Sequence, residues 1–193
     1  MEPFKILDGA MGSELIRRGL TLPLHIWSAD ANFSNPNMVE KIHREYIDAG
    51  ANYITANTFR TTPWAYKKTG VKEPETTAKS SLSKAIELAK KAAGNSVGVI
   101  GSIAPLEDCY LPDLFPGMDV AVTEFFKLGE WHLEAGVDIL LLETMNSISE
   151  TEAALIGIQN WGLPIWVSFV LMDEDHLLSG DRLIDTLNLI KDY

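Results

Sequence analysis

The chain has 193 residues, of which 46% are apolar and 22% charged, as in a globular domain with one core. Its formal net charge is −11, from 16 basic and 27 acidic residues, and such an acidic surface repels nucleic acid and anionic lipid, so we expect neither as a partner. The single cysteine, Cys109, excludes an intrachain disulfide and suits a reducing cytoplasm, and no apolar run approaches the roughly 20 residues that span a bilayer.

Short apolar runs alternate with longer segments of helical periodicity. In chain order, the pattern predicts a strand over Phe4–Asp8, a helix over Ser13–Arg18, a helix opened by Asn35 as its cap and Pro36, a strand over Tyr53–Asn57, a helix over Pro74–Ala93, a strand over Val97–Ser102, a helix over Val120–Ala135, a strand over Asp138–Glu143, a helix over Ser149–Trp161, a strand over Pro164–Phe169 and a helix over Asp181–Lys191.

These repeats predict a parallel α/β sheet. The strands are apolar nearly throughout, which indicates that both faces of the sheet are covered. An Ala-Gly pair precedes two of the strands, at Ala49–Gly50 and Ala135–Gly136, as in a barrel of equivalent units. No linker divides the chain, so we expect one domain over residues 1–193. A doubly wound open sheet is the alternative, but the turn at Asp8–Ser13 resembles a dinucleotide-binding loop only loosely.

Every predicted strand ends in a side chain that can hydrogen-bond. These residues are Asp8, Asn57 with Thr58, Ser102, Glu143 with Thr144, and Ser168. In parallel α/β folds the functional groups gather at the carboxyl ends of the strands. Taken together, the residues therefore predict a pocket for a polar substrate. Trp27 is expected in a loop over that pocket.

Each of these residues also has a structural interpretation. Asp8 could cap the helix that follows it. Asn57, Thr58, Ser102 and Ser168 could satisfy backbone groups of the loops. Glu143 is harder to explain in this way, because a carboxylate that closes an apolar run is partly buried and needs a partner. That partner could be a bound ammonium group or a basic residue such as Arg60.

Metal-binding patterns are missing from the sequence. The four histidines, His25, His43, His132 and His176, show no metal-ligand spacing, and we interpret them as structural or solvated. A lone cysteine such as Cys109 is ordinarily an unreactive thiol, although contact with a metal stays open.

Several segments, in the correct order along the whole chain, resemble the homocysteine S-methyltransferase family. They are Leu7–Leu15, Ile26–Ala29, His43–Ala51, Thr55–Phe59, Gly101–Pro105, Leu140–Met145, Trp166–Phe169 and Leu178–Gly180. The resemblance implies a (β/α)₈ barrel of the TIM type, of which only about five βα units are present in this chain.

The resemblance also implies functional roles. Members of the family bind homocysteine and zinc, and transfer a methyl group to the homocysteine thiol from a small donor. By this resemblance, Asp8 and Gly9 form the floor of the homocysteine site and Glu143 accepts hydrogen bonds from the amino group. Trp27 shields the site, and its mouth is lined by Asn57, Thr58, Ser102 and Ser168. The segments Trp27–Ala29 and Asp173–Leu177 favour a donor of the S-methylmethionine type.

The family's zinc is held by three cysteines that this sequence lacks, and Cys109 matches none of them. A (β/α)₈ barrel typically needs about 250 residues. Five units leave an open sheet edge, so we expect self-association or a partner chain to cover it. We therefore expect a homocysteine S-methyltransferase-like protein that is inactive as this chain alone. The alternative is a non-catalytic barrel remnant that binds an amino acid or assembles with another chain.

Overall fold

The structure is a computed structural model that describes residues 4–193, so residues 1–3 of the predicted domain lie outside it. Its strands are β1 (Tyr53–Thr55), β2 (Gly98–Ile103), β3 (Ile139–Met145) and β4 (Ile165–Phe169). Its α-helices are α1 (Met11–Arg17), α2 (Ala31–Ser34), α3 (Pro36–Asp48), α4 (Pro63–Lys67), α5 (Pro74–Ala93), α6 (Met118–Ala135), α7 (Ile148–Ile158) and α8 (Leu183–Leu189). No helix within residues 4–193 is both long and apolar enough to cross a membrane.

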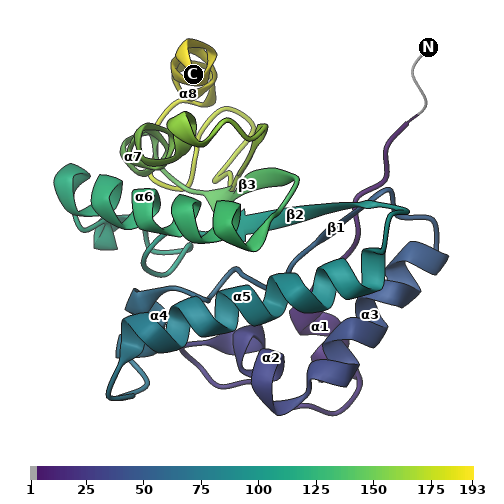
Figure 1. Cartoon of the computed structure of the whole chain (residues 1–193). Helices are drawn as coiled ribbons and strands as arrows, with labels where there is room; N and C mark the ends of the chain where they lie inside the picture. The colour runs from purple at the N-terminus through teal and green to yellow at the C-terminus, as the bar shows by residue number, and fades with distance from the viewer. Residues whose placement is uncertain (1–3) are drawn as a thin grey trace.

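The four strands form one parallel sheet in the order β1-β2-β3-β4. Because crossovers between parallel strands are right-handed, strands that follow one another in chain order place their helices on one face. The helices do follow one another around the sheet, since α5 contacts α3 and α6, and α6 contacts α7 (Figure 1). A doubly wound sheet would reverse its strand order, so the alternative fold is wrong.

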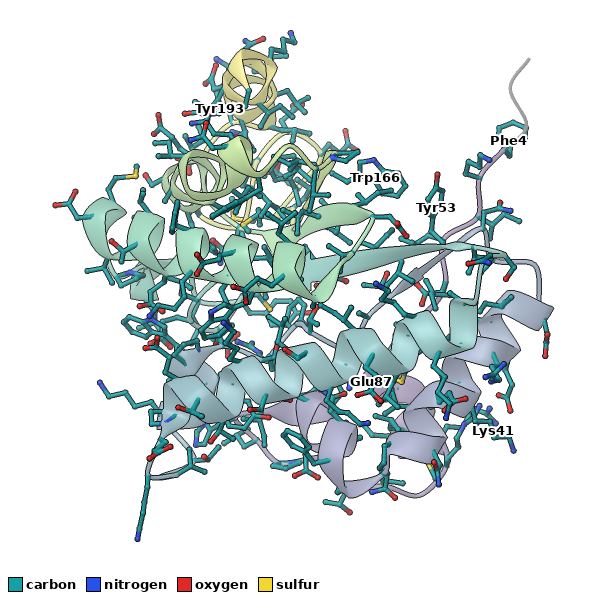
Figure 2. All side chains as sticks on the ribbon, in the orientation of Figure 1. Phe4, Lys41, Tyr53, Glu87, Trp166 and Tyr193 are labelled. Carbon is teal, nitrogen blue, oxygen red and sulfur yellow. The ribbon has the colours of Figure 1, made fainter. Side chains whose placement is uncertain are left out.

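The opposite face of the sheet is concave. Tyr53 on β1 and Trp166 on β4 meet edge to face with ring centroids 5.2 Å apart (Figure 2). In a flat sheet, three strand spacings would separate these positions by about 14 Å. The contact therefore shows that the sheet curves toward this face, where Ile100, Ile139 and Leu141 form an apolar layer beside Tyr53.

The main core lies between the sheet and its helices. Ile54, Val99, Leu140 and Leu142 face this side and are almost fully buried, and Phe125 packs against them from α6. The strand residues of this core alternate with those of the concave face, as the two-residue period of a strand requires. Both faces are thus apolar over the middle of the sheet, as the unbroken apolar runs predict.

The first predicted strand is wrong in extent. Phe4–Asp8 forms only one parallel bridge, between Leu7 and Tyr53, although the amide of Asp8 also donates to the carbonyl of Tyr53. Phe4 is 97% exposed, so no layer of the described chain covers this segment. Helix α3 begins at Pro36 as predicted, with Asn35 in the N-cap position. Its side chain makes no capping hydrogen bond and donates instead to Ser34 Oγ.

Helices α6 and α7 approach closely at Gly157. A Cβ atom at this position would lie 2.8 Å from the backbone nitrogen of Phe126 and 3.0 Å from the carbonyl oxygen of Val122. Both are backbone atoms of α6, so they move only if the whole helix moves. Glycine is therefore required for the spacing of the two helices.

We expect Gly157→Ala to lower the free energy of unfolding by about 2 kcal/mol, since an added methyl group overpacks this contact. Urea unfolding followed by circular dichroism measures the change. Ser149→Ala, at an exposed position on the same helix, is the matched control and should change stability by less than about 0.5 kcal/mol. Equal stability of the two variants would contradict the close approach.

Candidate active site

A cavity of about 640 Å³ opens at the carboxyl ends of the strands. It is lined by Leu7–Gly12, Leu24, Trp27–Ser28, Thr55–Asn57, Phe59–Arg60, Ser102, Asp108–Tyr110 and Glu143–Thr144. Of the predicted site residues, the cavity brings together Asp8, Gly9, Trp27, Asn57, Ser102 and Glu143. Thr58 and Ser168 are not among its lining residues.

Asp8 lines the cavity where the first segment meets β1. Its carboxylate accepts hydrogen bonds from the amide of Thr55 (2.9 Å) and from Thr55 Oγ1 (3.0 Å). Helix α1 begins after Ala10 without a side-chain cap, so the capping role considered for Asp8 is wrong. Burial raises the pKa of Asp8 to about 6, against the opposing hydrogen bonds from Thr55, and the charge of Glu143 adds a smaller rise.

The raised pKa of Asp8 predicts a pH dependence of stability. The folded protein holds this proton up to about pH 6, whereas the unfolded chain releases it near the ordinary value of 3.8. The folded state thus binds more protons between these values, so this group's contribution to stability is lost as the pH rises through the window. Asp8→Asn, which mimics the protonated form, should become more stable relative to the wild type between about pH 4 and about pH 7.

Urea unfolding of both proteins across this range measures the difference in stability, in which the titration of groups that do not interact with Asp8 cancels. Parallel stability profiles would contradict the raised pKa of Asp8.

Glu143 faces the same cavity from β3. Its Oε2 accepts a hydrogen bond from Ser102 Oγ at 2.5 Å. Burial raises the pKa of Glu143, and the hydrogen bond from Ser102 opposes that rise. Within residues 4–193 no basic side chain forms an ion pair with Glu143 or Asp8. Two carboxylates therefore share one cavity, and neither forms an ion pair within the described chain.

A β-bulge at the end of β3 brings Thr144 into the cavity beside Glu143. The register of β3 on β4 passes from Leu142 opposite Val167 to Met145 opposite Phe169, so β3 carries one extra residue. Thr144 has φ 57°, a backbone conformation that is costly for a β-branched residue. In a regular strand, successive side chains point to opposite faces, yet Glu143 and Thr144 both line the cavity.

Ser168 holds this bulge. Its Oγ accepts a hydrogen bond from the amide of Thr144 at 3.1 Å, and Thr144 Oγ1 donates to the carbonyl of Glu143 at 2.6 Å. Ser168 is thus not a lining residue of the cavity, and it stabilises the backbone next to Glu143.

Asn57 and Thr58 connect the loops around the cavity. The amide nitrogen of Asn57 donates to the carbonyl of Ser28 (2.7 Å) and to Asn32 Oδ1 (2.8 Å), while its oxygen accepts from Ser28 Oγ (2.6 Å). Thr58 Oγ1 donates to the carbonyl of Ser102 (2.8 Å) and accepts from its amide (2.9 Å). The structural interpretation considered for both residues agrees with these bonds.

Two glycines make room for large side chains beside the cavity. A Cβ atom on Gly12 would lie 2.4 Å from Trp27 Nε1, and one on Gly9 would lie 2.7 Å from Tyr46 Oη. Trp27 is 43% exposed and lines the cavity, as expected for a residue that covers a site.

Sequence reasoning missed several lining residues. Thr55 holds Asp8, and its position two residues before Asn57 on the same strand could have indicated it. Phe59, Cys109 and Tyr110 come from loops, where no periodicity predicts the direction of a side chain. Arg60 lines the cavity but donates to the carbonyl of Glu107 at 2.9 Å, so it is not the basic partner that we considered for Glu143.

The residues of the described chain do not fit a zinc centre. Within residues 4–193 no group of three histidine, cysteine, aspartate or glutamate side chains lies close enough together to hold a metal ion. A zinc site needs three or four such ligands. Cys109 is buried in the cavity wall, and burial raises the pKa of its thiol.

Comparisons with known proteins all indicate the same protein family. A family model described as homocysteine S-methyltransferase matches residues 5–193. The homocysteine S-methyltransferase of Escherichia coli is 32% identical over 205 residues, covering 97% of this chain and 65% of that protein. Homocysteine S-methyltransferase 2 of Zea mays is 28% identical, covering 93% of this chain and 60% of that protein. The chain thus spans less than two thirds of the length of these relatives.

Solved structures are similar over the whole chain. The metallated form of the homocysteine methyltransferase MmuM from Escherichia coli has a TM-score of 0.87 and 30% identity, covering 100% of this chain and 72% of that one. Its apo form has a TM-score of 0.78.

Proposed function

We propose that this chain, which belongs to the homocysteine S-methyltransferase family, forms the homocysteine-binding part of a site for methyl transfer to the homocysteine thiol. Its curved parallel sheet would be part of a (β/α)₈ barrel, with about five βα units in residues 1–193. A cytoplasmic location belongs to the same proposal, because the single cysteine suits a reducing compartment.

The observation that carries this proposal is the pair of carboxylates without a cationic partner, Asp8 and Glu143. A partly buried carboxylate is costly unless a positive group pairs with it. The ammonium group of an amino acid supplies that charge, and the cavity is large enough for an amino acid together with a small methyl donor. Ser102 and Thr55 would hold the two carboxylates in place.

The reaction forms a carbon–sulfur bond to homocysteine, breaks the bond between the methyl group and its donor, and releases the thiol proton to the solvent. This chain would contribute orientation, because an anchored amino group fixes the direction of the thiol. For the donor we propose a small molecule of the S-methylmethionine type. The cavity has aromatic walls at Trp27, Phe59 and Tyr110, and aromatic faces attract a cationic sulfonium.

A non-catalytic role is the second candidate. The described residues do not fit a zinc centre, so these 193 residues alone would bind the amino acid without transferring a methyl group. Assembly with another copy or a partner chain would then cover the exposed sheet edge of β4, which pairs only with β3 in the described chain.

Isothermal titration of the purified chain with homocysteine tests the binding proposal, with norleucine, which lacks sulfur, as the comparison ligand. Incubation with homocysteine and S-methylmethionine, followed by mass spectrometry for methionine, separates the two candidates. Binding without methionine formation favours the non-catalytic role, and methionine formation contradicts it. Absence of homocysteine binding would overturn the proposed function. Light scattering on the same sample measures self-association.

A further inference from the structure

Arg60 is a positive charge in the cavity that no acidic side chain neutralises. It is half-buried, and in the described part of the chain it forms no ion pair. The nearby carboxylate of Glu107 is paired with Lys68 instead. Arg60 reaches only the backbone carbonyl of Glu107, through Nη1 at 2.9 Å. A guanidinium without a carboxylate inside a pocket is a ready partner for an anionic ligand.

The surroundings of Arg60 fix its orientation. Its guanidinium carbon lies 5.2 Å from the centroid of the Phe59 ring, and the bond to the carbonyl of Glu107 holds one end of the fork. An arginine has five N–H donors in a planar arrangement. One of them is used by Glu107, which leaves donors for a bidentate contact with a carboxylate.

The positive and negative charges of the cavity are held by different parts of the fold. The positive charge of Arg60 acts on the thiol of Cys109, in the loop after β2, where it opposes the burial-driven rise in the pKa. Asp8 is hydrogen-bonded to Thr55 on β1 and Glu143 to Ser102 on β2, whereas Arg60 is hydrogen-bonded to the carbonyl of Glu107 in the loop after β2. The cavity therefore holds two carboxylates and one guanidinium, and no ion pair joins Arg60 to Asp8 or Glu143 in the described part of the chain. This pattern is complementary to a zwitterion.

We infer that Arg60 binds the α-carboxylate of the amino-acid ligand while Asp8 and Glu143 receive its ammonium group. Arg60 is then a specificity-determining residue that selects an α-amino acid over an amine or a thiol of the same length. The inference rests on the proposed function in one respect, namely that the ligand of the cavity is an amino acid.

The test is isothermal titration of the full chain, under reducing conditions, with homocysteine and with 3-aminopropane-1-thiol, which lacks only the carboxylate. We expect the wild type to prefer homocysteine by at least about 10-fold, as for a charge-assisted contact of about 1.4 kcal/mol or more. In Arg60→Gln this preference should fall to near parity, with binding of the carboxylate-free thiol unchanged. Arg60→Lys, which keeps the charge without the fork, should lie between them.

Arg44→Gln is the control variant, because Arg44 pairs with Glu40 on the outer side of α3 and does not line the cavity. It should retain the wild-type preference. Equal weakening of both ligands in Arg60→Gln would mean a merely structural role and would overturn the inference. An unchanged preference in Arg60→Gln, or no preference in the wild type, would overturn it as well.

Failure of the proposed function gives a different pattern. If the wild type binds methionine or homoserine but not homocysteine, and Arg60→Gln loses that binding, the carboxylate assignment stands while the assignment of homocysteine fails. If homocysteine binds equally well to the wild type and to Arg60→Gln, the proposed function stands and the role of Arg60 is refuted.

Discussion

Replacement of Glu143 by glutamine is expected to weaken homocysteine binding by about 30- to 100-fold. The loss follows because the ammonium group would exchange a charge-assisted bond for a neutral one at a site shielded from water, which corresponds to about 2–3 kcal/mol. The same change should stabilise the free protein at neutral pH, since it removes a buried carboxylate that lacks a cation. Titration calorimetry and urea unfolding measure the two effects separately.

Glu150→Gln is the matched control for Glu143. Glu150 is also a buried glutamate whose pKa burial raises, but its Oε1 accepts a hydrogen bond from the amide of Leu106 at 2.8 Å. It does not line the cavity. Its replacement should leave homocysteine binding within about two-fold of the wild type, because no ligand contact is lost. If Glu143→Gln were instead less stable and bound homocysteine normally, Glu143 would be a structural residue.

Glu143 is expected to favour ligand binding and to lower the stability of the free protein. A residue with such a cost stands out in the sequence. An acidic side chain at the end of Ile139–Leu142 conflicts with its apolar surroundings, and such local conflicts mark functional positions. The sequence could not show how the conflict is arranged in space. The bulge at Thr144 depends on the register between β3 and β4, and on the hydrogen bond from the amide of Thr144 to Ser168 Oγ.

The rule that polar residues follow the strands was less reliable for the neutral side chains. Asn57, Thr58 and Ser168 follow strands as Asp8 and Glu143 do, yet their hydrogen-bonding groups are used within the fold. A neutral amide or hydroxyl is readily satisfied by a backbone group, so its position alone does not indicate a ligand. A buried carboxylate has fewer partners available, which makes the charged positions more informative.

The fold was predictable where a strand lies between two helical segments in the sequence. The longer runs at β2, β3 and β4 match their predicted ranges closely, because apolar strands between helical repeats leave little choice of structure. The segment Phe4–Asp8 is also rich in apolar residues, but it forms only one bridge, at Leu7, and few backbone hydrogen bonds. Composition reports the tendency to form a strand, whereas a strand also requires hydrogen-bonding partners over its length.

Asn57→Ala should lower the free energy of unfolding by about 3–5 kcal/mol, the largest effect on stability that we predict. The change would remove three buried hydrogen bonds, and it would leave Ser28 Oγ, the carbonyl of Ser28 and Asn32 Oδ1 without the partner that Asn57 provides. Each buried polar group left unsatisfied costs about 1–3 kcal/mol. Urea unfolding measures the total.

Asn52→Ala is the matched control for Asn57→Ala, because Asn52 is exposed and makes one hydrogen bond, from the amide of Ile6 to its Oδ1 at 2.9 Å. This replacement should lower the free energy of unfolding by less than about 1 kcal/mol.

Asn57 also connects the segment Trp27–Ser34 to the end of β1, so hydrogen exchange of that segment should accelerate in Asn57→Ala. Homocysteine binding should weaken with it, because Trp27 would no longer be held over the cavity. Loss of stability with normal exchange in this segment would show that Asn57 supports only the core. The position of Trp27 would then depend on the space at Gly12 and on the hydrogen bond from the amide of Trp27 to the carbonyl of Pro23.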